Sequence, residues 1–180
     1  MRPPLRNVLL AITGSSGARE ADRLIGAFTD ENINVTAVLT PRAQAFVPPL
    51  EVETFTDSRW TTEPWHITLP ERSDAFVVAP ATCNTLAKAS HGFTDNLALA
   101  CMASWEGEIL FFPGMNRRMW QYQATAHNVS KLEKLGHFVA PPLSAVAESS
   151  QMDGDAVGWS PEYVVGTVLH RRHLQMSHPR

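Results

Sequence analysis

The hydrophobic residues of the chain gather in short uninterrupted runs separated by more polar stretches. Five runs have the length of a β-strand, at residues 8–12, 33–39, 75–79, 109–112 and 137–140. Each is followed by a stretch compatible with a helix, and this alternation predicts parallel strands joined by crossover helices. Residues 75–79 are apolar at every position, as expected for a strand covered on both faces. We therefore predict an α/β fold built on a doubly wound parallel sheet with helices on both faces.

Capping residues and a proline mark the starts of the predicted helices. Helices are expected over residues 17–30, 86–91, 96–104, 117–135 and 162–174. In that order, the signals at their starts are Ser15 with Ser16, Asn84 with Thr85, Asp95, Asn116 and Pro161. Residues 48–74 and 141–160 are rich in Pro, Ser, Thr, Asp and Gly without a sustained period, and we predict loops there. We interpret residues 1–180 as a single Rossmann-like (flavodoxin-like) domain with a mobile flap at about 141–160 and a frayed tail at 175–180.

Composition and charge narrow the function. A net charge of −3 over 180 residues, without a basic stripe, argues against nucleic acid or a membrane as a partner. The N-terminus enters the first predicted strand at once, which leaves no room for a signal peptide, so we expect a cytoplasmic protein. Cys83 and Cys101 lie in apolar segments and are predicted to be buried, reduced thiols. We predict no metal site, because no third ligand accompanies His170 and His173.

A polar turn follows the first predicted strand. It reads Thr13-Gly14-Ser15-Ser16-Gly17-Ala18, and its N–H groups and hydroxyls meet the start of a helix, where the helix dipole favours an anion. A phosphate site and a simple tight connection are equally compatible with the turn. A nicotinamide site usually has an acid at the end of the second strand for the ribose, whereas here Arg42 follows that strand and would suit only a phosphorylated ribose. The sequence also lacks Tyr-x-x-x-Lys, typical of short-chain reductases, and Gly-x-x-x-x-Gly-Lys, typical of nucleotide kinases.

Two further polar strings follow predicted strands, at the sheet edge where open α/β folds bind ligands. They are Pro80-Ala81-Thr82-Cys83-Asn84-Thr85 and Pro113-Gly114-Met115-Asn116-Arg117-Arg118-Met119-Trp120. Helix capping is the alternative interpretation of the hydroxyls in the first string and of Asn116 in the second. A neutral amide such as that of Asn116 suits a decarboxylase, because a cation would stabilise the ionised ground state more than a transition state that is losing its charge.

Four strings in the chain resemble motifs of the homo-oligomeric flavin-containing cysteine decarboxylases. Besides the two above, they are Gly92-Phe93-Thr94-Asp95-Asn96-Leu97 and Trp65-His66-Ile67-Thr68-Leu69. The family motifs read Pro-Ala-Ser-Ala-Asn-Thr, Pro-x-Met-Asn-x-x-Met-Trp, Gly-x-x-Asp-Asn-Leu and His-Ile-x-Leu, in the same order along the chain. This sequence departs from them at Thr82, which keeps the hydroxyl of Ser, and at Cys83, which replaces Ala. The similarity covers residues 6–140 well and the flap only loosely.

The resemblance implies an FMN cofactor and assigns roles to individual residues. The phosphate ligands would be Gly14, Ser15, Ser16 and Thr40, and the flavin ring and ribityl chain would lie on Pro80, Ala81, Thr82, Cys83, Asn84 and Thr85, with Asp95, Asn96 and Met115 also at the cofactor. His66 would be the catalytic base, Asn116 would bind the substrate carboxylate, Met119 would line the pocket, and Asp153 and Gly154 of the flap would close over the substrate.

The flap separates two branches of this family. Phosphopantothenoylcysteine decarboxylases carry a Cys-Gly-Asp string there, whose thiol lets the reduced flavin return electrons to the product, whereas residues 147–159 of this chain contain no cysteine. We therefore expect an epidermin-type enzyme that oxidatively decarboxylates the C-terminal cysteine of a ribosomally made precursor peptide to an aminoenethiol. The alternative is phosphopantothenoylcysteine decarboxylation in coenzyme A biosynthesis. Flavin prenyl transfer and a non-catalytic regulatory flavoprotein are more distant alternatives.

The resemblance also implies the partners of the chain. These are a precursor peptide that ends in Cys and further copies of the chain itself, as a homotrimer or a homododecamer with FMN between subunits.

Overall fold

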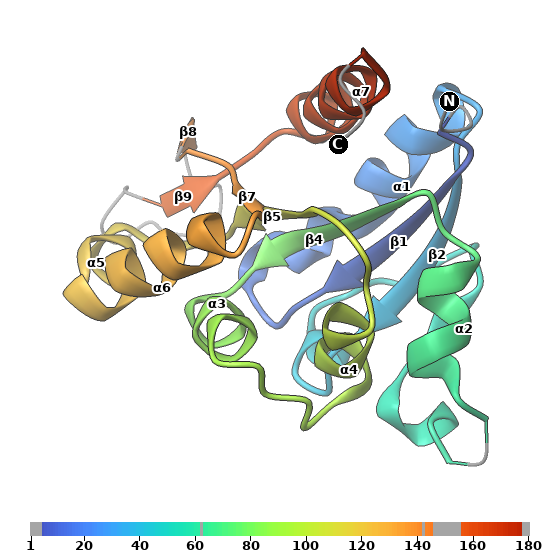
Figure 1. The fold of residues 1–180 in the computed structure, drawn as a ribbon, viewed down its shortest axis with the longest axis horizontal. Helices are drawn as coiled ribbons and strands as arrows, with labels where there is room; N and C mark the ends of the chain where they lie inside the picture. Colours follow the sequence, from blue (N-terminus) through green and yellow to red (C-terminus); the bar gives the residue numbers. More distant parts are fainter. Residues whose placement is uncertain (1–4, 62, 142, 146–155, 178–180) are drawn as a thin grey trace.

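A computed structural model describes residues 5–61, 63–141, 143–145 and 156–177. Its centre is a parallel sheet of six strands in the order β3-β2-β1-β4-β5-β7, shown in Figure 1. The strands are β1 (Asn7–Ile12), β2 (Asn34–Leu39), β3 (Thr54–Phe55), β4 (Ala75–Ala81), β5 (Ile109–Pro113) and β7 (Phe138–Val139). All five predicted strands are present, and the predicted α/β class is confirmed.

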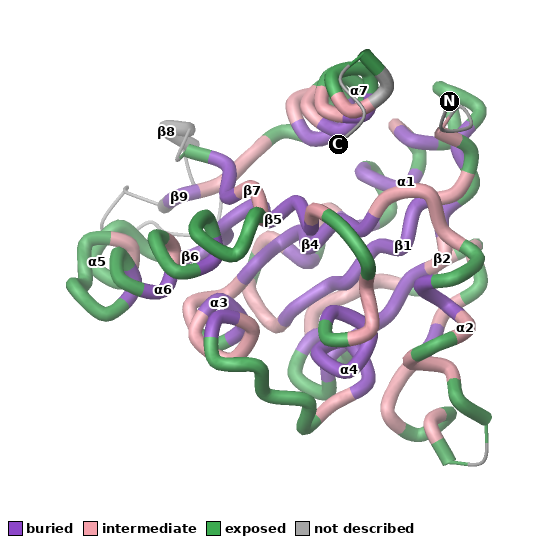
Figure 2. Tube along the Cα trace, viewed as in Figure 1, coloured by how far each residue is buried: buried purple, intermediate pink, exposed green. Residues whose placement is uncertain are grey.

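Helices cover both faces of this sheet, and each face has its own hydrophobic core. Helices α1 (Ala21–Asp30) and α7 (Pro161–Ser177) lie against one face. The opposite face is covered by α2 (Trp65–Glu71), α3 (Cys83–Ser90), α4 (Leu97–Ala103) and α6 (Gln123–Lys134). Along β1, Leu10 and Ile12 point into the first core, whereas Leu9 and Ala11 point into the second. This two-sided burial, visible in Figure 2, explains why the strands are apolar at consecutive positions.

Both predicted loops contain regular structure. Residues 48–74 include β3, the 3₁₀ helix η3 (Asp57–Arg59) and α2, and residues 141–160 include β8 (Leu143–Ala145) and β9 (Ala156–Gly158). With β6 (Met115–Asn116), the last two strands form a small antiparallel sheet in the order β6-β9-β8. The prediction missed these elements because strands of two or three residues and a helix of two turns are too short to show a hydrophobic period.

Several helix boundaries differ from the predicted ones. The first helix opens as the 3₁₀ segment η1 (Ser16–Glu20), and a further 3₁₀ turn, η2 (Ala43–Ala45), follows β2. Thr82 caps α3, which therefore starts three residues before the predicted 86, and Asn96 instead of Asp95 caps α4. The helix predicted over 117–135 is interrupted at Tyr122, whose backbone is extended, and so forms α5 (Arg117–Gln121) and α6. Helix α7 runs to Ser177 and so includes residues 175–177 of the predicted tail, whereas residues 178–180 lie outside the described residues.

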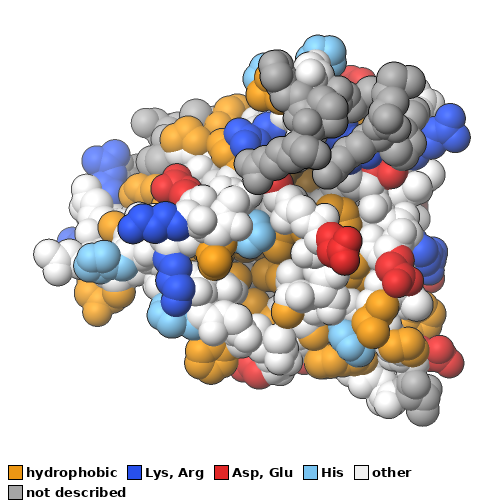
Figure 3. Space-filling view, in the orientation of Figure 1, with side chains coloured by type: hydrophobic (Ala, Val, Ile, Leu, Met, Phe, Trp, Pro, Cys, Tyr) orange, Lys and Arg blue, Asp and Glu red, His pale blue; other side chains and the backbone are white. Residues whose placement is uncertain are grey.

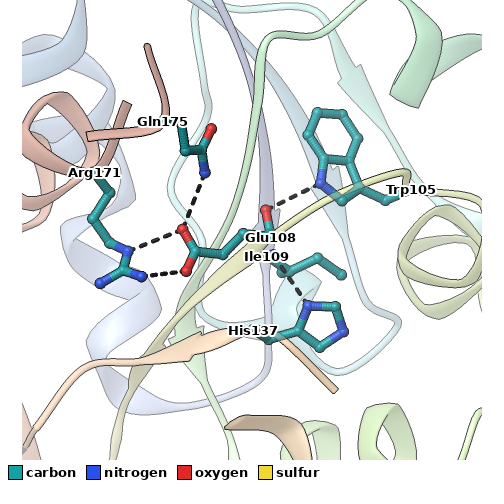
Figure 4. Close-up of polar contacts among 6 residues, drawn as sticks. All are labelled: Trp105, Glu108, Ile109, His137, Arg171 and Gln175. Carbon is teal, nitrogen blue, oxygen red and sulfur yellow. Dashed lines mark hydrogen bonds and ion pairs between the residues drawn. The ribbon is translucent and has the colours of Figure 1, made fainter. Parts of the chain in front are cut away.

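A polar network closes the amino edge of the sheet, just before β5, as Figure 4 shows. The Glu108 carboxylate accepts hydrogen bonds from both ends of the Arg171 guanidinium, one of them at 2.9 Å from Nε, and from Gln175 Nε2 at 3.2 Å. The Glu108 carbonyl accepts from Trp105 Nε1 at 3.1 Å, and His137 Nδ1 accepts from the N–H of Ile109 at 3.3 Å. Burial lowers the pKa of His137, and the negative charge of Glu108 opposes that shift. This network ties α7 to the start of β5.

The charged side chains on the face seen in Figure 3 carry both signs and are dispersed among uncharged ones. This arrangement matches the small net charge of −3. In the described part of the chain, no helix is long and apolar enough to cross a membrane.

Candidate functional site

Three loops meet where the central strands β1, β4 and β5 end. The side chain of Thr13, directly after β1, joins two of them: its Oγ1 donates to the Pro80 carbonyl at 2.7 Å and accepts from the Thr82 N–H at 3.0 Å. The third loop is tied to the second by the Gly114 N–H, which donates to the Ala81 carbonyl at 3.0 Å. Thr13 is fully buried, so this junction is a rigid part of the scaffold.

The three loops approach one another so closely that glycine is needed at the contact. A Cβ atom on Gly114 would lie 2.6 Å from Pro80 Cβ and 3.2 Å from Ser15 Oγ, and a Cβ on Gly17 would lie 3.5 Å from the same hydroxyl. Within the described residues, the buried Ser15 Oγ has no hydrogen-bond partner. A buried hydroxyl without a partner is costly, so this atom marks a place where a ligand would be bound.

The end of β2 lies beside the same turn. A Cβ on Gly14 would lie 2.4 Å from Cγ of Arg42, so the Arg42 stem packs directly over the turn. The Thr40 N–H donates to the Ile12 carbonyl at 3.1 Å, and Ala43 N–H donates to the Thr40 carbonyl at 2.9 Å. Thr40 therefore lies beside the turn that carries the Ser15 hydroxyl and that was predicted as a phosphate site. Both are at the carboxyl edge of the sheet.

The string Pro80–Thr85 forms the end of β4 and the first turn of α3. The capping interpretation holds for Thr82, whose Oγ1 accepts from the Thr85 N–H at 3.2 Å and lies 2.9 Å from Thr85 Oγ1. Cys83 Sγ lies 3.2 Å from Thr125 Oγ1, which donates to the Met119 carbonyl at 2.7 Å. Because the Thr125 hydroxyl hydrogen is used on Met119, the Cys83 thiol is the donor to Thr125. This chain of bonds ties α3 to α5, so Cys83 and Met119 are held together although they are far apart in sequence.

Asn116 is an exposed helix cap whose amide has a defined orientation. Its Oδ1 accepts from the N–H groups of Arg118 at 2.8 Å and Met119 at 3.3 Å, at the start of α5. With the oxygen bound to the helix, the Nδ2 amide group is on the opposite side and presents two N–H donors outward. The capping interpretation and the binding interpretation of Asn116 are therefore compatible.

Asp95 and Asn96 have structural partners. Lys88 Nζ forms an ion pair with the Asp95 carboxylate, and Asn96 Oδ1 accepts from the Leu99 N–H at 3.0 Å as the cap of α4. Both interactions hold the connection between α3 and α4. The Asp-Asn pair therefore has a structural role that requires no ligand.

His66 lies on α2, far from the other predicted catalytic residue. Helix α2 and the start of α5, which carries Asn116, lie at opposite sides of the molecule in Figure 1. The His66 ring is half-buried, and its Nδ1 accepts from Trp60 Nε1 at 3.1 Å. A single chain therefore does not bring His66 and Asn116 together.

Neither cysteine has the properties of a metal ligand. Burial raises the pKa of Cys101 to about 12, so its thiol stays protonated. Both cysteines are free thiols, as predicted, although Cys83 is only half-buried. The described segments contain no group of His, Cys, Asp and Glu that could hold a metal ion. Asp153 and Gly154, the predicted flap residues, lie outside the described residues.

Three residues at or near the site were not among those predicted: Thr13, Trp60 and Thr125. Thr13 directly follows the first strand, and this position was the one available signal. Trp60 forms a hydrogen bond to His66, six residues away along the chain, and Thr125 forms one with Cys83, 42 residues away. No sequence spacing in the motifs indicates either bond.

Comparison with known proteins gives matches over most of the chain. Residues 2–173 match the family model described as Flavoprotein. The probable phosphopantothenoylcysteine decarboxylase of Streptococcus mutans is 30% identical over 163 residues, covering 84% of this chain and 91% of that protein. The phosphopantothenoylcysteine decarboxylase of Mus musculus is 34% identical over 151 residues, covering 76% of this chain and 73% of that protein.

Solved structures agree with these matches. A mutant PPC decarboxylase complexed with pantothenoylaminoethenethiol is 30% identical, with a TM-score of 0.84 and coverage of 94% of this chain and 99% of that one. TvaF, an FMN-dependent cysteine decarboxylase from thioviridamide biosynthesis, is 27% identical, with a TM-score of 0.71 and coverage of 76% and 90%. The predicted fold and the resemblance to flavin-containing cysteine decarboxylases are thereby confirmed. The chain belongs to the flavoprotein family that includes the phosphopantothenoylcysteine decarboxylases.

Proposed function

We propose that the protein is an FMN-dependent decarboxylase that removes the carboxylate of a terminal cysteine. The observation that carries this proposal is the convergence of three loops on the Ser15 hydroxyl, which has no hydrogen-bond partner among the described residues. The third loop continues from Gly114 to the Asn116 amide, two residues further on. Family membership supports the flavin, and the names of the relatives support decarboxylation of a cysteine.

The cofactor is FMN, and the residues present fit its phosphate. A phosphate beside Ser15 would supply the missing acceptor for the buried hydroxyl, with Gly14, Ser16 and Thr40 around it. The flavin ring and ribityl chain would lie along the string Pro80–Thr85, with Met115 on the neighbouring loop. When bound there, FMN would supply the two-electron oxidation of the cysteine side chain that makes loss of carbon dioxide possible.

Asn116 binds the substrate carboxylate through its outward Nδ2 group. The amide is neutral, so it orients the carboxylate without the strong ground-state stabilisation that an Arg or Lys would give. Met119 lies one turn along α5, and its side chain is 48% exposed, which suits an apolar pocket wall that a ligand covers. Because Cys83 and Thr125 hold the Met119 carbonyl, the carboxylate clamp and the flavin shelf keep a fixed relation.

The complete site forms between two copies of the chain. Helix α2, which carries His66, and helix α5, which Asn116 caps, lie on opposite sides of one molecule, so the two residues can act on one substrate only if α2 of one subunit meets α5 of another. Exposed apolar side chains on both helices support this contact: Ile67, next to His66 on α2, is 44% exposed, and Tyr122, at the end of α5, is 63% exposed. A closed ring, most simply a trimer or a dodecamer built from such trimers, satisfies the requirement with every site filled.

Two substrates are consistent with this chemistry. Phosphopantothenoylcysteine is favoured by both curated relatives, which carry that name at 30% and 34% identity. A precursor peptide that ends in cysteine is the second candidate, and one observation favours it: residues 147–159 contain no cysteine that could return electrons from the reduced flavin. With the peptide, the product is the enethiol and an external oxidant reoxidises the flavin. Phosphopantothenoylcysteine decarboxylation in coenzyme A biosynthesis would instead return the two electrons to the product.

Mass spectrometry of the products tests both the reaction and the substrate. The protein with bound FMN is incubated in air with phosphopantothenoylcysteine and, separately, with short peptides ending in Cys. Oxidative decarboxylation gives a mass loss of about 46 Da, from carbon dioxide and two hydrogens, whereas the redox-neutral reaction gives about 44 Da. No mass loss from any cysteine substrate would refute the proposed function. Reaction of only one substrate class would decide between the two candidates.

A further inference from the structure

The indole of Trp60 fixes the tautomer of the His66 ring. Its Nε1–H lies 3.1 Å from His66 Nδ1, with the ring centroids 5.4 Å apart and the rings tilted by 58°. An indole nitrogen can only donate, so Nδ1 must be the acceptor. A neutral imidazole carries one ring proton, which in this geometry is on Nε2.

The Trp60 side chain is held by a supported segment. The Trp60 N–H donates to the Asp57 carbonyl at 3.0 Å, and Asp57 Oδ1 accepts from the Leu97 N–H of α4 at 2.9 Å. The guanidinium of Arg59 lies 4.2 Å above the ring of Phe55, which is fully buried. Trp60 also packs against the second hydrophobic core. The donor of the Trp60–His66 bond is therefore anchored, which favours one orientation of the His66 ring.

We propose that Trp60 is a positioning residue that makes His66 a hydrogen-bond donor at the decarboxylation site. This inference rests on the proposed function. The Nε2–H of His66 points its positive end at an anion, and the anion that the chemistry supplies is the sulfur of the substrate cysteine, bound as its thiolate. The thiol proton is released to solvent when the substrate binds, so His66 itself takes no proton. The role differs from that of the general base predicted from the sequence, because a base would need a free lone pair on Nε2.

Two substitutions of His66 distinguish a donor from a base. In His66→Gln, the longer amide can place its NH₂ group near the position of Nε2, whereas the shorter amide in His66→Asn can reach only the position of Nδ1. We expect His66→Gln to keep kcat/KM within about tenfold of wild type and His66→Asn to lose about a hundredfold, the effect of a lost hydrogen bond to a charged group. Equal, complete loss in both variants would overturn the proposal, since neither amide can act as a base.

The tautomer is measured independently of activity. Solid-state ¹⁵N NMR of histidine-labelled protein distinguishes a protonated from an unprotonated ring nitrogen, and the signals of His66 are identified by their absence in His66→Gln. We expect unprotonated Nδ1 and protonated Nε2 in the wild type, and a partial shift of the proton to Nδ1 in Trp60→Phe. The matched control is Trp65→Phe, since the Trp65 ring packs on Phe55 at 4.8 Å; it should keep the wild-type tautomer.

The activity of the same variants separates positioning from stability. Trp60→Phe should lower kcat/KM about tenfold at unchanged FMN content, and Trp65→Phe should lower it less. A wild-type ring protonated on Nδ1 would overturn the inference whatever the activity. A wild type that shows the Nε2–H tautomer but decarboxylates no cysteine substrate would instead overturn the proposed function and, with it, the catalytic part of the inference.

Discussion

At the amino edge of the sheet, the polar side chains bind one another, whereas at the carboxyl edge polar groups are left available. The Glu108 carboxylate is surrounded by Arg171 and Gln175, and this network is complete within one chain (Figure 4). At the other edge, the Ser15 hydroxyl has no partner within the described residues, and Asn116 uses its oxygen but presents its amide hydrogens outward. The difference teaches that satisfied polar groups serve the fold, and that buried or oriented groups with spare capacity mark where a ligand binds.

The strongest test of this contrast is Asn116→Asp. An aspartate caps a helix as well as asparagine does, so the fold should persist, but its charge repels the substrate carboxylate. We expect kcat/KM to fall about a hundredfold or more, with the melting temperature and FMN content unchanged. The matched control is Asn34→Asp at the amino edge, where the exposed Asn34 side chain donates to Asn7 Oδ1 at 3.2 Å. Near wild-type turnover of Asn116→Asp would show that this residue does not bind the carboxylate.

At the amino edge, Glu108→Gln should change stability but not the site. The Glu108 side chain is 14% exposed and paired with Arg171, which is 32% exposed, so solvent screens the pair only in part. We expect the free energy of unfolding to fall by about 1–3 kcal/mol in urea titrations, while the Kd for FMN stays the same. A weakened FMN affinity in the folded variant would mean that the two edges are coupled.

Ser15→Ala should have the opposite signature. Removing the hydroxyl deprives the phosphate of a hydrogen bond, and we expect the Kd for FMN to rise about tenfold. The variant without cofactor should be no less stable than wild type, because the hydroxyl has no partner in the described residues. Fluorescence titration of the cofactor-free protein gives the Kd, and an unchanged value would remove Ser15 from the phosphate site.

The smallest expected effect is a pH dependence at His137. Burial lowers the pKa of His137 in the folded protein, with Glu108 opposing the shift, so the folded state favours the neutral ring. Stability from this residue is therefore complete above the pKa of the unfolded chain, and it declines as the pH falls below about 6.5. His137→Asn keeps an acceptor for the Ile109 N–H but does not titrate, and its unfolding free energy should depend less on pH, by less than about 1 kcal/mol. Equal pH dependence in both proteins would contradict this assignment.

The sequence predicted the sheet well because its signal is local. Residues 75–79 are apolar throughout, and a strand buried on both faces has that pattern. The position of Asn116 after β5 was predictable for the same reason, since the carboxyl ends of parallel strands share one edge. The small sheet of β6, β9 and β8 was not, because its strands are only two or three residues long and show no hydrophobic period, and β6 pairs with β9 from about 40 residues away.

The relation between the site residues was less predictable than their identity. Motifs indicated His66 and Asn116, but only the fold shows that their helices, α2 and α5, lie on opposite sides of one molecule. The donor to His66 and the bonds from Cys83 through Thr125 to Met119 depend on how helices pack, and helix packing brings together residues with no fixed spacing. The sequence therefore identified candidate site residues, and the structure shows which residues bond to them.

The central claim is that FMN at the carboxyl edge decarboxylates a terminal cysteine. Its most direct test is a single turnover without oxygen, in which protein with bound FMN is mixed with an excess of each candidate cysteine substrate. Flavin absorbance and product mass are followed together. The account predicts bleaching of the flavin together with an equivalent amount of product about 46 Da lighter, and recovery of the colour only when air is admitted. A flavin that stays oxidised, with the carboxylate of every cysteine substrate intact, would contradict it.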